Sequence, residues 1–193
     1  MKAVQERLGS RRIYAGLDPE APGWDERITP ARAAFIQARD SLYIATASAD
    51  GRPYIQHRGG PRGFLKVLDE RTLAFGDFGG NRQYISMGNL EENDRACLFL
   101  MDYPNRRRLK IWGRAEVVQG EPDLVAKVRD PGYRAEVQRV FLFHVDVMDG
   151  NCPQHIEPRF TEKEVEERIG PLRRRIAELE EEVAGCCPDP AAP

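Results

Sequence analysis

The amino-acid sequence predicts a mainly β fold: a small antiparallel barrel with short flanking helices and a helix near its C-terminal end. Several short stretches have the residue pattern of strands and are joined by tight turns, while few stretches have helical periodicity. We expect strands at residues 41–48, 52–58, 63–68, 72–76, 95–101, 108–118 and 140–148. Closure of such a sheet into a barrel removes exposed strand edges.

The first half of the chain carries clear start and turn signals. Thr29 and Pro30 predict a helix start, because threonine caps helices and proline fits the first helical turn. Asp50-Gly51 is typical of a tight hairpin between the first two strands. A second hairpin is expected around Asp69-Glu70, and a glycine loop then leads into a short helix over residues 82–90.

Two later strands differ in their patterns. Residues 95–101 (RACLFLM) are almost continuously apolar, which predicts a strand buried on both faces. Residues 108–118 alternate instead, so one face points inward and the other presents Arg108, Lys110 and Trp112. A short helix is expected near residues 121–129, before the last strand.

The C-terminal helix begins with the capping box Thr161-x-x-Glu164. Its apolar residues recur at alternating steps of four and three, which is the spacing of a coiled-coil seam. The seam comprises Val165, Ile169, Leu172, Ile176, Leu179 and Val183. Gly170-Pro171 interrupts it. A helix of this length is marginal alone, so we expect it to pack either on its own barrel or on a partner chain.

Composition and charge restrict the class of protein. The 193 residues divide into an arm at 1–27, a barrel domain at 28–160, a helix at 161–185 and a loose tail at 186–193. The net charge of −2 gives no reason to expect nucleic-acid or membrane partners. There is no apolar run long enough to span a bilayer and no signal sequence. The four cysteines form no disulfide framework, so we expect a cytoplasmic protein.

A phosphate-binding corner is predicted where the glycine loop enters its helix. Amides at a helix start point outward and favour negative charge. The corner offers Asp77, Asn81, Arg82, Gln83 and Ser86. Basic residues lie nearby in the sequence at Arg58, Arg62 and Lys66. A solvated basic surface would give the same residue pattern, but the clustering beside a glycine loop favours a ligand site.

Other candidate groups are weaker. Trp112, flanked by Arg108 and Lys110, suits either a planar ligand or a protein interface. Cys152-x-x-His155 supplies two of the four ligands that a structural zinc needs, so no metal site is predicted. No residue stands out as a catalytic acid, base or nucleophile.

Several motifs in order give the chain a resemblance to a known family. They are the Asp50-Gly51 hairpin, Gly63-Phe64-Leu65-Lys66, Phe75-Gly76-Asp77 before the glycine loop, Asn89–Arg95 before an apolar strand, and Gly113–Val117. In this order and spacing the sequence resembles the FMN-binding split-barrel family related to pyridoxamine 5'-phosphate oxidase, over about residues 33–118.

The resemblance implies a six-stranded antiparallel split barrel and a homodimer with two FMN molecules at its interface. It implies that Lys66, Gly76 and Asp77 lie at the cofactor and that Arg108 reaches the flavin of the other subunit. It also implies that the phosphate is held by Asn81, Arg82, Gln83 and Ser86. The full set of expected cofactor-binding residues is Arg58, Arg62, Gly63, Phe64, Lys66, Gly76, Asp77, Asn81, Arg82, Gln83, Ser86, Asn89, Arg108 and Trp112. The Arg-x-His substrate signature of the oxidase is missing, which leaves the substrate open.

Three hypotheses of function follow. The first is an FMN-binding homodimer that carries out redox chemistry on a small molecule. The second is a non-catalytic module of the same fold that holds flavin or haem. The third is a barrel that binds nucleic acid or a protein partner through its basic strand face, against which the net charge argues.

Overall fold

The structure is a computed structural model that describes residues 2–10, 12, 27–80, 82–150 and 153–186. In chain order its elements are α1 (Lys2–Arg7), α2 (Pro30–Gln37), β1 (Ser41–Ala47), β2 (Pro53–Gly59), β3 (Lys66–Val67), β4 (Thr72–Phe78), α3 (Ile85–Glu92), β5 (Arg95–Asp102), β6 (Arg107–Val118), α4 (Pro122–Val128), β7 (Val137–Gly150) and α5 (Glu162–Cys186). No helix in this part of the chain is long and apolar enough to cross a membrane.

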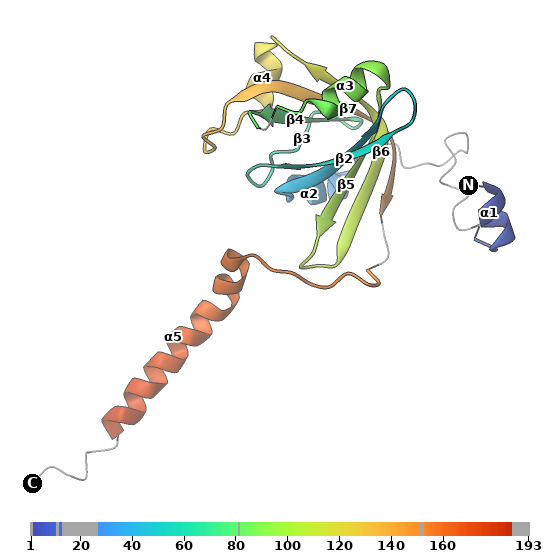
Figure 1. Ribbon diagram of the computed structural model, residues 1–193. Coiled ribbons are helices and arrows are strands. Elements are labelled where there is room, and N and C mark those ends of the chain that lie inside the picture. Colours follow the sequence, from blue (N-terminus) through green and yellow to red (C-terminus); the bar gives the residue numbers. More distant parts are fainter. Residues whose placement is uncertain (1, 11, 13–26, 81, 151–152, 187–193) are drawn as a thin grey trace, which may run out of the picture.

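All strands belong to one antiparallel sheet in the order β2-β1-β5-β6-β7-β4-β3, and the sheet curls into a barrel (Figure 1). The two end strands, β2 and β3, are not paired with each other, so the barrel is split along one side. The predicted antiparallel split barrel is confirmed. The sheet has seven strands rather than the six implied by the resemblance, because the two-residue β3 pairs separately with β4.

The barrel interior is one apolar cluster to which nearly every strand contributes. Phe75 of β4 and Phe141 of β7 are fully buried and stack with ring centroids 4.9 Å apart. Phe35 and Ile36 of α2 join the same cluster, so α2 packs on the barrel. A smaller cluster, which includes Val128, holds α4 against β4 and β7. Burial of such side chains is the main stabilising contribution to a domain of this size.

A glycine allows β6 to approach β7 closely. The register of these two strands shifts between Trp112 and Gly113. A Cβ atom on Gly113 would lie 2.0 Å from the carbonyl oxygen of His144, a distance that no side chain tolerates. The position therefore requires glycine, as is common where a strand bulges against another backbone.

The start and turn signals in the first half of the chain are found where they were predicted. The Thr29 side chain accepts a hydrogen bond from the Arg32 backbone amide, and Pro30 occupies the first turn of α2. Gly51 has a φ of 85° in the turn between β1 and β2, a left-handed conformation that favours glycine.

Two predicted elements were placed wrongly. The helix expected over residues 82–90 is α3 and begins at Ile85, because Arg82 and Tyr84 have φ values of 58° and 50° that a helix does not allow. The strand expected at 63–68 is reduced to β3, because Gly63 has a φ of 84° and the chain is still turning there.

The prediction that the 95–101 strand is buried on both faces is also wrong. In β5, the inward residues Ala96, Leu98 and Leu100 are buried, but the alternate residues are half-buried. These outward residues are Cys97, Phe99 and Met101. In β6 the predicted alternation is confirmed, with Leu109, Ile111 and Ala115 inside.

Helix α5 projects away from the barrel (Figure 1). The predicted capping box is confirmed: the Glu164 backbone amide donates to the Thr161 hydroxyl at 3.2 Å, and the Thr161 amide donates to the Glu164 carboxylate at 2.9 Å. The helix continues through Pro171 instead of breaking there. Five seam residues are 39–65% exposed, so the seam is not packed on the barrel.

Candidate functional site

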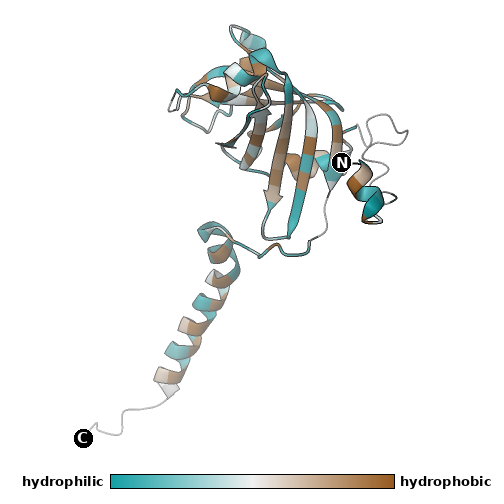
Figure 2. Ribbon diagram, turned by 45° about the vertical axis from the view of Figure 1, so that its right-hand side comes forward, coloured by the Kyte–Doolittle hydropathy of each residue, from teal (hydrophilic) through white to brown (hydrophobic). Residues whose placement is uncertain are grey.

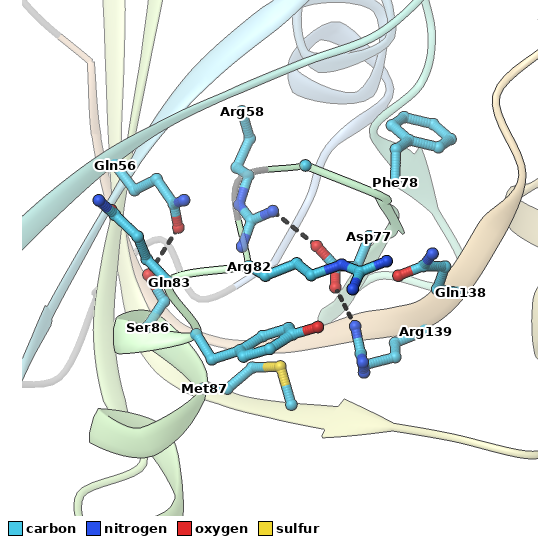
Figure 3. A pocket seen from close by; sticks show the side chains of 12 residues that line it. Gln56, Arg58, Asp77, Phe78, Arg82, Gln83, Ser86, Met87, Gln138 and Arg139 are labelled. Carbon is cyan, nitrogen blue, oxygen red and sulfur yellow. Dashed lines mark hydrogen bonds and ion pairs between the residues drawn. The ribbon is translucent and has the colours of Figure 1, made fainter.

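A polar hollow lies where β2, β4 and β7 meet the loop that leads into α3 (Figure 3). It is lined by Gln56, Arg58, Asp77, Phe78, Gly80, Arg82, Gln83, Tyr84, Ser86, Met87, Gln138 and Arg139. Its volume is about 60 Å³, enough for roughly four to six water molecules or one anion of phosphate size. It is therefore too small to enclose an aromatic ligand.

A buried carboxylate holds two guanidinium groups at this hollow. Arg58 of β2 donates to Oδ1 of Asp77 at 2.6 Å, and Arg139 of β7 donates to Oδ2 at 3.0 Å. Asp77 is only 6% exposed. Arg139 lies directly opposite Asp77 in the pairing of β4 with β7, so the sheet register brings the two together. Each carboxylate oxygen thus fixes one arginine.

Both arginines retain hydrogen-bonding capacity. The Nε atoms of Arg58 and Arg139 are buried and have no hydrogen-bond partner among the described residues. Buried donors of this kind are normally satisfied, so each is a candidate contact for a ligand. The Arg58 guanidinium also stacks on Phe141, 4.8 Å from the ring centroid, and that of Arg139 on Tyr84 at 5.1 Å. The hydrogen bond to Asp77 raises the pKa of Arg139.

The loop and the first turn of α3 complete the hollow. The Ser86 side chain is buried and donates to the amide oxygen of Gln56 at 2.9 Å. Arg82 extends across the hollow towards Asp77 and Gln138 (Figure 3). Left-handed conformations at Arg82 and Tyr84 are unusual for these residue types, and such conformations concentrate at binding sites.

The electrostatics of this arrangement suit a doubly charged anion. Three arginines (Arg58, Arg82 and Arg139) and one carboxylate (Asp77) line the hollow, which gives a formal charge of 3 − 1 = +2. A phosphate monoester carries close to two negative charges at neutral pH. Guanidinium forks match phosphate oxygens in both geometry and charge.

The hollow collects five of the residues expected from the sequence. Arg58, Asp77, Arg82, Gln83 and Ser86 all line it. Asn81, which was expected with them, lies outside the described residues. Gly76 precedes Asp77 in β4 and does not line the hollow; a Cβ there would meet the Val137 side chain at 3.0 Å.

Four expected residues after β2 lie elsewhere. Arg62 is largely exposed and forms an ion pair with Glu164 at the start of α5 (3.6 Å). Gly63 makes a turn, and Phe64 is a core residue. Lys66 is half-buried in β3, opposite Ala74, and does not line the hollow.

The remaining three expected residues also lie away from the hollow. Asn89 of α3 is buried and donates to the Thr46 hydroxyl at 2.9 Å, a structural hydrogen bond between α3 and β1. Trp112 lies on the outer face of β6, where the Lys110 ammonium is 5.7 Å from its ring centroid. Arg108 lines a second hollow of about 320 Å³ with Phe35 of α2, and its Nε is buried without a partner among the described residues.

Sequence reasoning missed Gln56, Tyr84, Gln138 and Arg139 at the hollow. Arg139 is the most important of these because it shares Asp77 with Arg58. It lies in β7 but just before the strand predicted at 140–148, and no local sequence signal marked it. Knowledge of how β4 pairs with β7 would have identified Arg139, because it lies opposite Asp77 and opposite charges at paired positions stabilise neighbouring strands.

No cluster of three or more histidine, cysteine, aspartate or glutamate side chains suited to a metal ion occurs in the described parts of the chain. Of the Cys152-x-x-His155 pair, for which no metal site was predicted, Cys152 lies outside those parts. His155 follows β7 in a left-handed conformation.

Comparison with solved structures finds similar proteins of low sequence identity. HupZ from Group A Streptococcus is 19% identical with a TM-score of 0.52, over 68% of this chain and 99% of that one. A putative pyridoxamine 5'-phosphate oxidase from Lactobacillus delbrueckii is 20% identical with a TM-score of 0.48, over 64% and 94%. An FMN-binding protein from Syntrophomonas wolfei is 11% identical with a TM-score of 0.48, over 78% and 95%. No curated protein matches this chain.

The family itself is shown by sequence. A family model described as pyridoxamine 5'-phosphate oxidase matches residues 28–149, which include all seven strands except the last residue of β7. That match covers more than half of the chain. The chain therefore belongs to the pyridoxamine 5'-phosphate oxidase family.

Proposed function

We propose that this chain binds FMN through its phosphate at the Arg58–Asp77–Arg139 hollow and that the bound flavin carries out redox chemistry on a small molecule. The observation that carries the proposal is the pair of guanidiniums that Asp77 fixes. Each has a buried Nε without a hydrogen-bond partner among the described residues. Membership of the pyridoxamine 5'-phosphate oxidase family supports a flavin as the ligand attached to that phosphate.

Asp77 preorganises the two arginines for this task. Without a carboxylate between them, two positive groups in a confined site would repel each other and turn towards solvent. With it, the guanidiniums keep one orientation before a ligand arrives, which lowers the entropy lost on binding. The remaining net charge of +2 is then available to the phosphate.

The rest of the cofactor must lie outside the hollow. A volume of about 60 Å³ accommodates a phosphate but no ring system. We therefore propose that the ring lies against the barrel surface and that a second copy of the chain covers it. The flavin would supply hydride or electron transfer, and the protein would supply its position and its electrostatic environment.

The outer face of the barrel supports a homodimer. Paired positions on four neighbouring strands bring apolar side chains together: Ala45 opposite Ile55, Tyr43 opposite Phe99, and Cys97 opposite Trp112. Ile55 is 63% exposed in the single chain, which is high for an isoleucine on a sheet. Contiguous exposed apolar surface of this kind marks interaction sites.

The visible absorbance spectrum of the purified protein, followed by identification of any chromophore released on denaturation, tests this function. A two-band flavin spectrum that releases FMN supports it, and anaerobic bleaching by a reduced nicotinamide would add turnover to binding. A haem-like band would instead support the alternative function, a non-catalytic module that holds haem. A colourless protein that does not take up added FMN would contradict the proposal.

A further inference from the structure

We propose that α5 pairs with α5 of a second copy of the chain as a parallel two-stranded coiled coil. The inference rests on the seam of α5 and is independent of the flavin assignment. The first observation is that the seam is uncovered: Leu172, Ile176 and Val183 are 63%, 55% and 65% exposed. In the described parts of the chain, α5 meets the barrel domain through its first turn, where Glu164 pairs with Arg62.

The rest of α5 cannot stabilise it as a monomer. Outside the seam its surface is mainly charged, with ion pairs such as Arg173–Glu166 at 3.1 Å and Arg175–Glu178 at 2.9 Å. Exposed pairs of this kind contribute little. Most helical stability in proteins comes from packing of an apolar face, and no described residue of the single chain covers this face. Figure 2 shows the apolar residues of α5 well away from the barrel.

The spacing of the seam selects the partner. Six apolar residues at alternating steps of four and three match a heptad repeat, and a heptad seam packs best on a helix with the same repeat. The other described helices have only six to eight residues, too short to cover it. A second α5 has the required length and repeat.

The residue types at the seam favour a coiled coil of two helices. With Val165 at position d, the a positions hold Ile169, Ile176 and Val183, and the other d positions hold Leu172 and Leu179. β-Branched residues at a with leucine at d favour parallel dimers over higher oligomers. Pro171 occupies the outward position c, where its ring does not interrupt the seam.

The flanking charges favour the parallel orientation. In a parallel pair Arg175 at g faces Glu180 at e of the other helix, on both sides of the seam. The parallel arrangement also places Arg168 opposite Arg173 of the other helix, which is repulsive. Contacts within each chain weaken this repulsion, because the Arg168 guanidinium stacks on Phe160, 4.3 Å from the ring centroid. Arg173 is already paired with its own glutamate.

An antiparallel pair gives worse contacts. With a opposite d in the antiparallel arrangement, Glu166 would face Glu180 and Arg173 would face Arg173 of the other helix. Like charges at these positions select against an orientation.

Cys186 provides a direct test because it lies seven residues after Leu179, at the next d position. In a parallel pair the two Cys186 residues are opposite each other, whereas an antiparallel pair separates them by about 36 Å at 1.5 Å per residue. We would oxidise the full-length Cys187→Ser variant with oxidised glutathione and measure the covalent dimer on a non-reducing gel. The Cys186→Ser/Cys187→Ser variant measures any contribution of the other two cysteines.

Two matched comparisons make the test specific. Glu181→Cys in the Cys186→Ser/Cys187→Ser background places the thiol at the outward position f, and we expect at least 10-fold slower cross-linking there. Ile176→Glu in the Cys187→Ser background should abolish cross-linking, while Ala177→Glu, at the outward position b, should preserve it. Absence of the Cys186 cross-link, equal rates at positions 181 and 186, or equal effects of the two glutamate variants would each overturn the proposal.

Discussion

Asp77→Asn removes the charge that fixes Arg58 and Arg139 and leaves the shape of the side chain nearly unchanged. Loss of one partner from a buried ion pair costs about 3–5 kcal/mol, because the remaining charge is left without compensation. The Arg58 and Arg139 side chains are 18% and 17% exposed, so water reaches part of each guanidinium. We therefore expect a smaller loss, about 2–3 kcal/mol in the free energy of unfolding, which lies at or below the bottom of that range.

For a chain of this size, such a loss lowers the melting temperature by about 4–12 °C. Urea denaturation followed by circular dichroism, with protein free of cofactor, measures it. The matched control is Asp94→Asn, since Asp94 pairs with Arg114 at 3.1 Å on the exposed surface and should contribute less than about 1 kcal/mol.

Added inorganic phosphate sharpens the comparison. Asp77→Asn releases the two arginines that Asp77 holds at the hollow, so phosphate should stabilise this variant less than the wild-type protein. The reasoning is refuted if Asp77→Asn costs no more than Asp94→Asn, or if phosphate stabilises both proteins equally.

Three further predictions concern the barrel, its thiol and the C-terminal helix. Gly113→Ala should cost about 3 kcal/mol or more by urea denaturation, because its Cβ would overlap the His144 carbonyl oxygen; unchanged stability would contradict the bulge geometry. Burial raises the pKa of the Cys97 thiol above 9.0, so the folded state holds this proton more tightly than the unfolded state. The free energy of unfolding should therefore fall as pH rises above 9. In Cys97→Ala it should fall less steeply over the same pH range. Hydrogen bonds from Thr161 lower the pKa of Glu164, so the cap is complete above pH 4.5 and is lost as pH falls. Thr161→Ala should destabilise the helix by about 1 kcal/mol. The circular dichroism signal at 222 nm should therefore be weaker in this variant at neutral pH, while Thr161→Ser should retain it.

The parts of the fold that depend on local chemistry could be predicted from the sequence. Thr29 and Pro30 fix the start of α2 through a side-chain cap and a preset φ, which involve only adjacent residues. Gly51 in the first hairpin and the Thr161 capping box are local in the same sense. The alternation in β6 was visible because one face of the strand is charged.

The errors arose where distant parts of the chain decide the outcome. The apolar run in β5 could not reveal that its outer face stays half-exposed in the single chain, because that depends on what covers the sheet. Arg139 lies 62 residues from Asp77 and joins the site only through the register of β4 with β7. Lys66 and Arg62 were grouped with the loop because of their charge, yet the turn at Gly63 directs the chain elsewhere.

The direct test of the flavin-phosphate assignment is a fluorescence titration of the cofactor-free protein with FMN and with riboflavin, which lacks the phosphate. Charge-assisted hydrogen bonds contribute about 1.5–3 kcal/mol each, so each is equivalent to roughly a 10- to 100-fold change in Kd. We expect the wild-type protein to bind FMN at least 100-fold more tightly than riboflavin. Arg139→Ala should reduce that ratio by 10-fold or more, while Arg62→Ala should leave it unchanged. Equal affinities for the two flavins, or equal ratios in Arg139→Ala and wild type, would contradict the assignment.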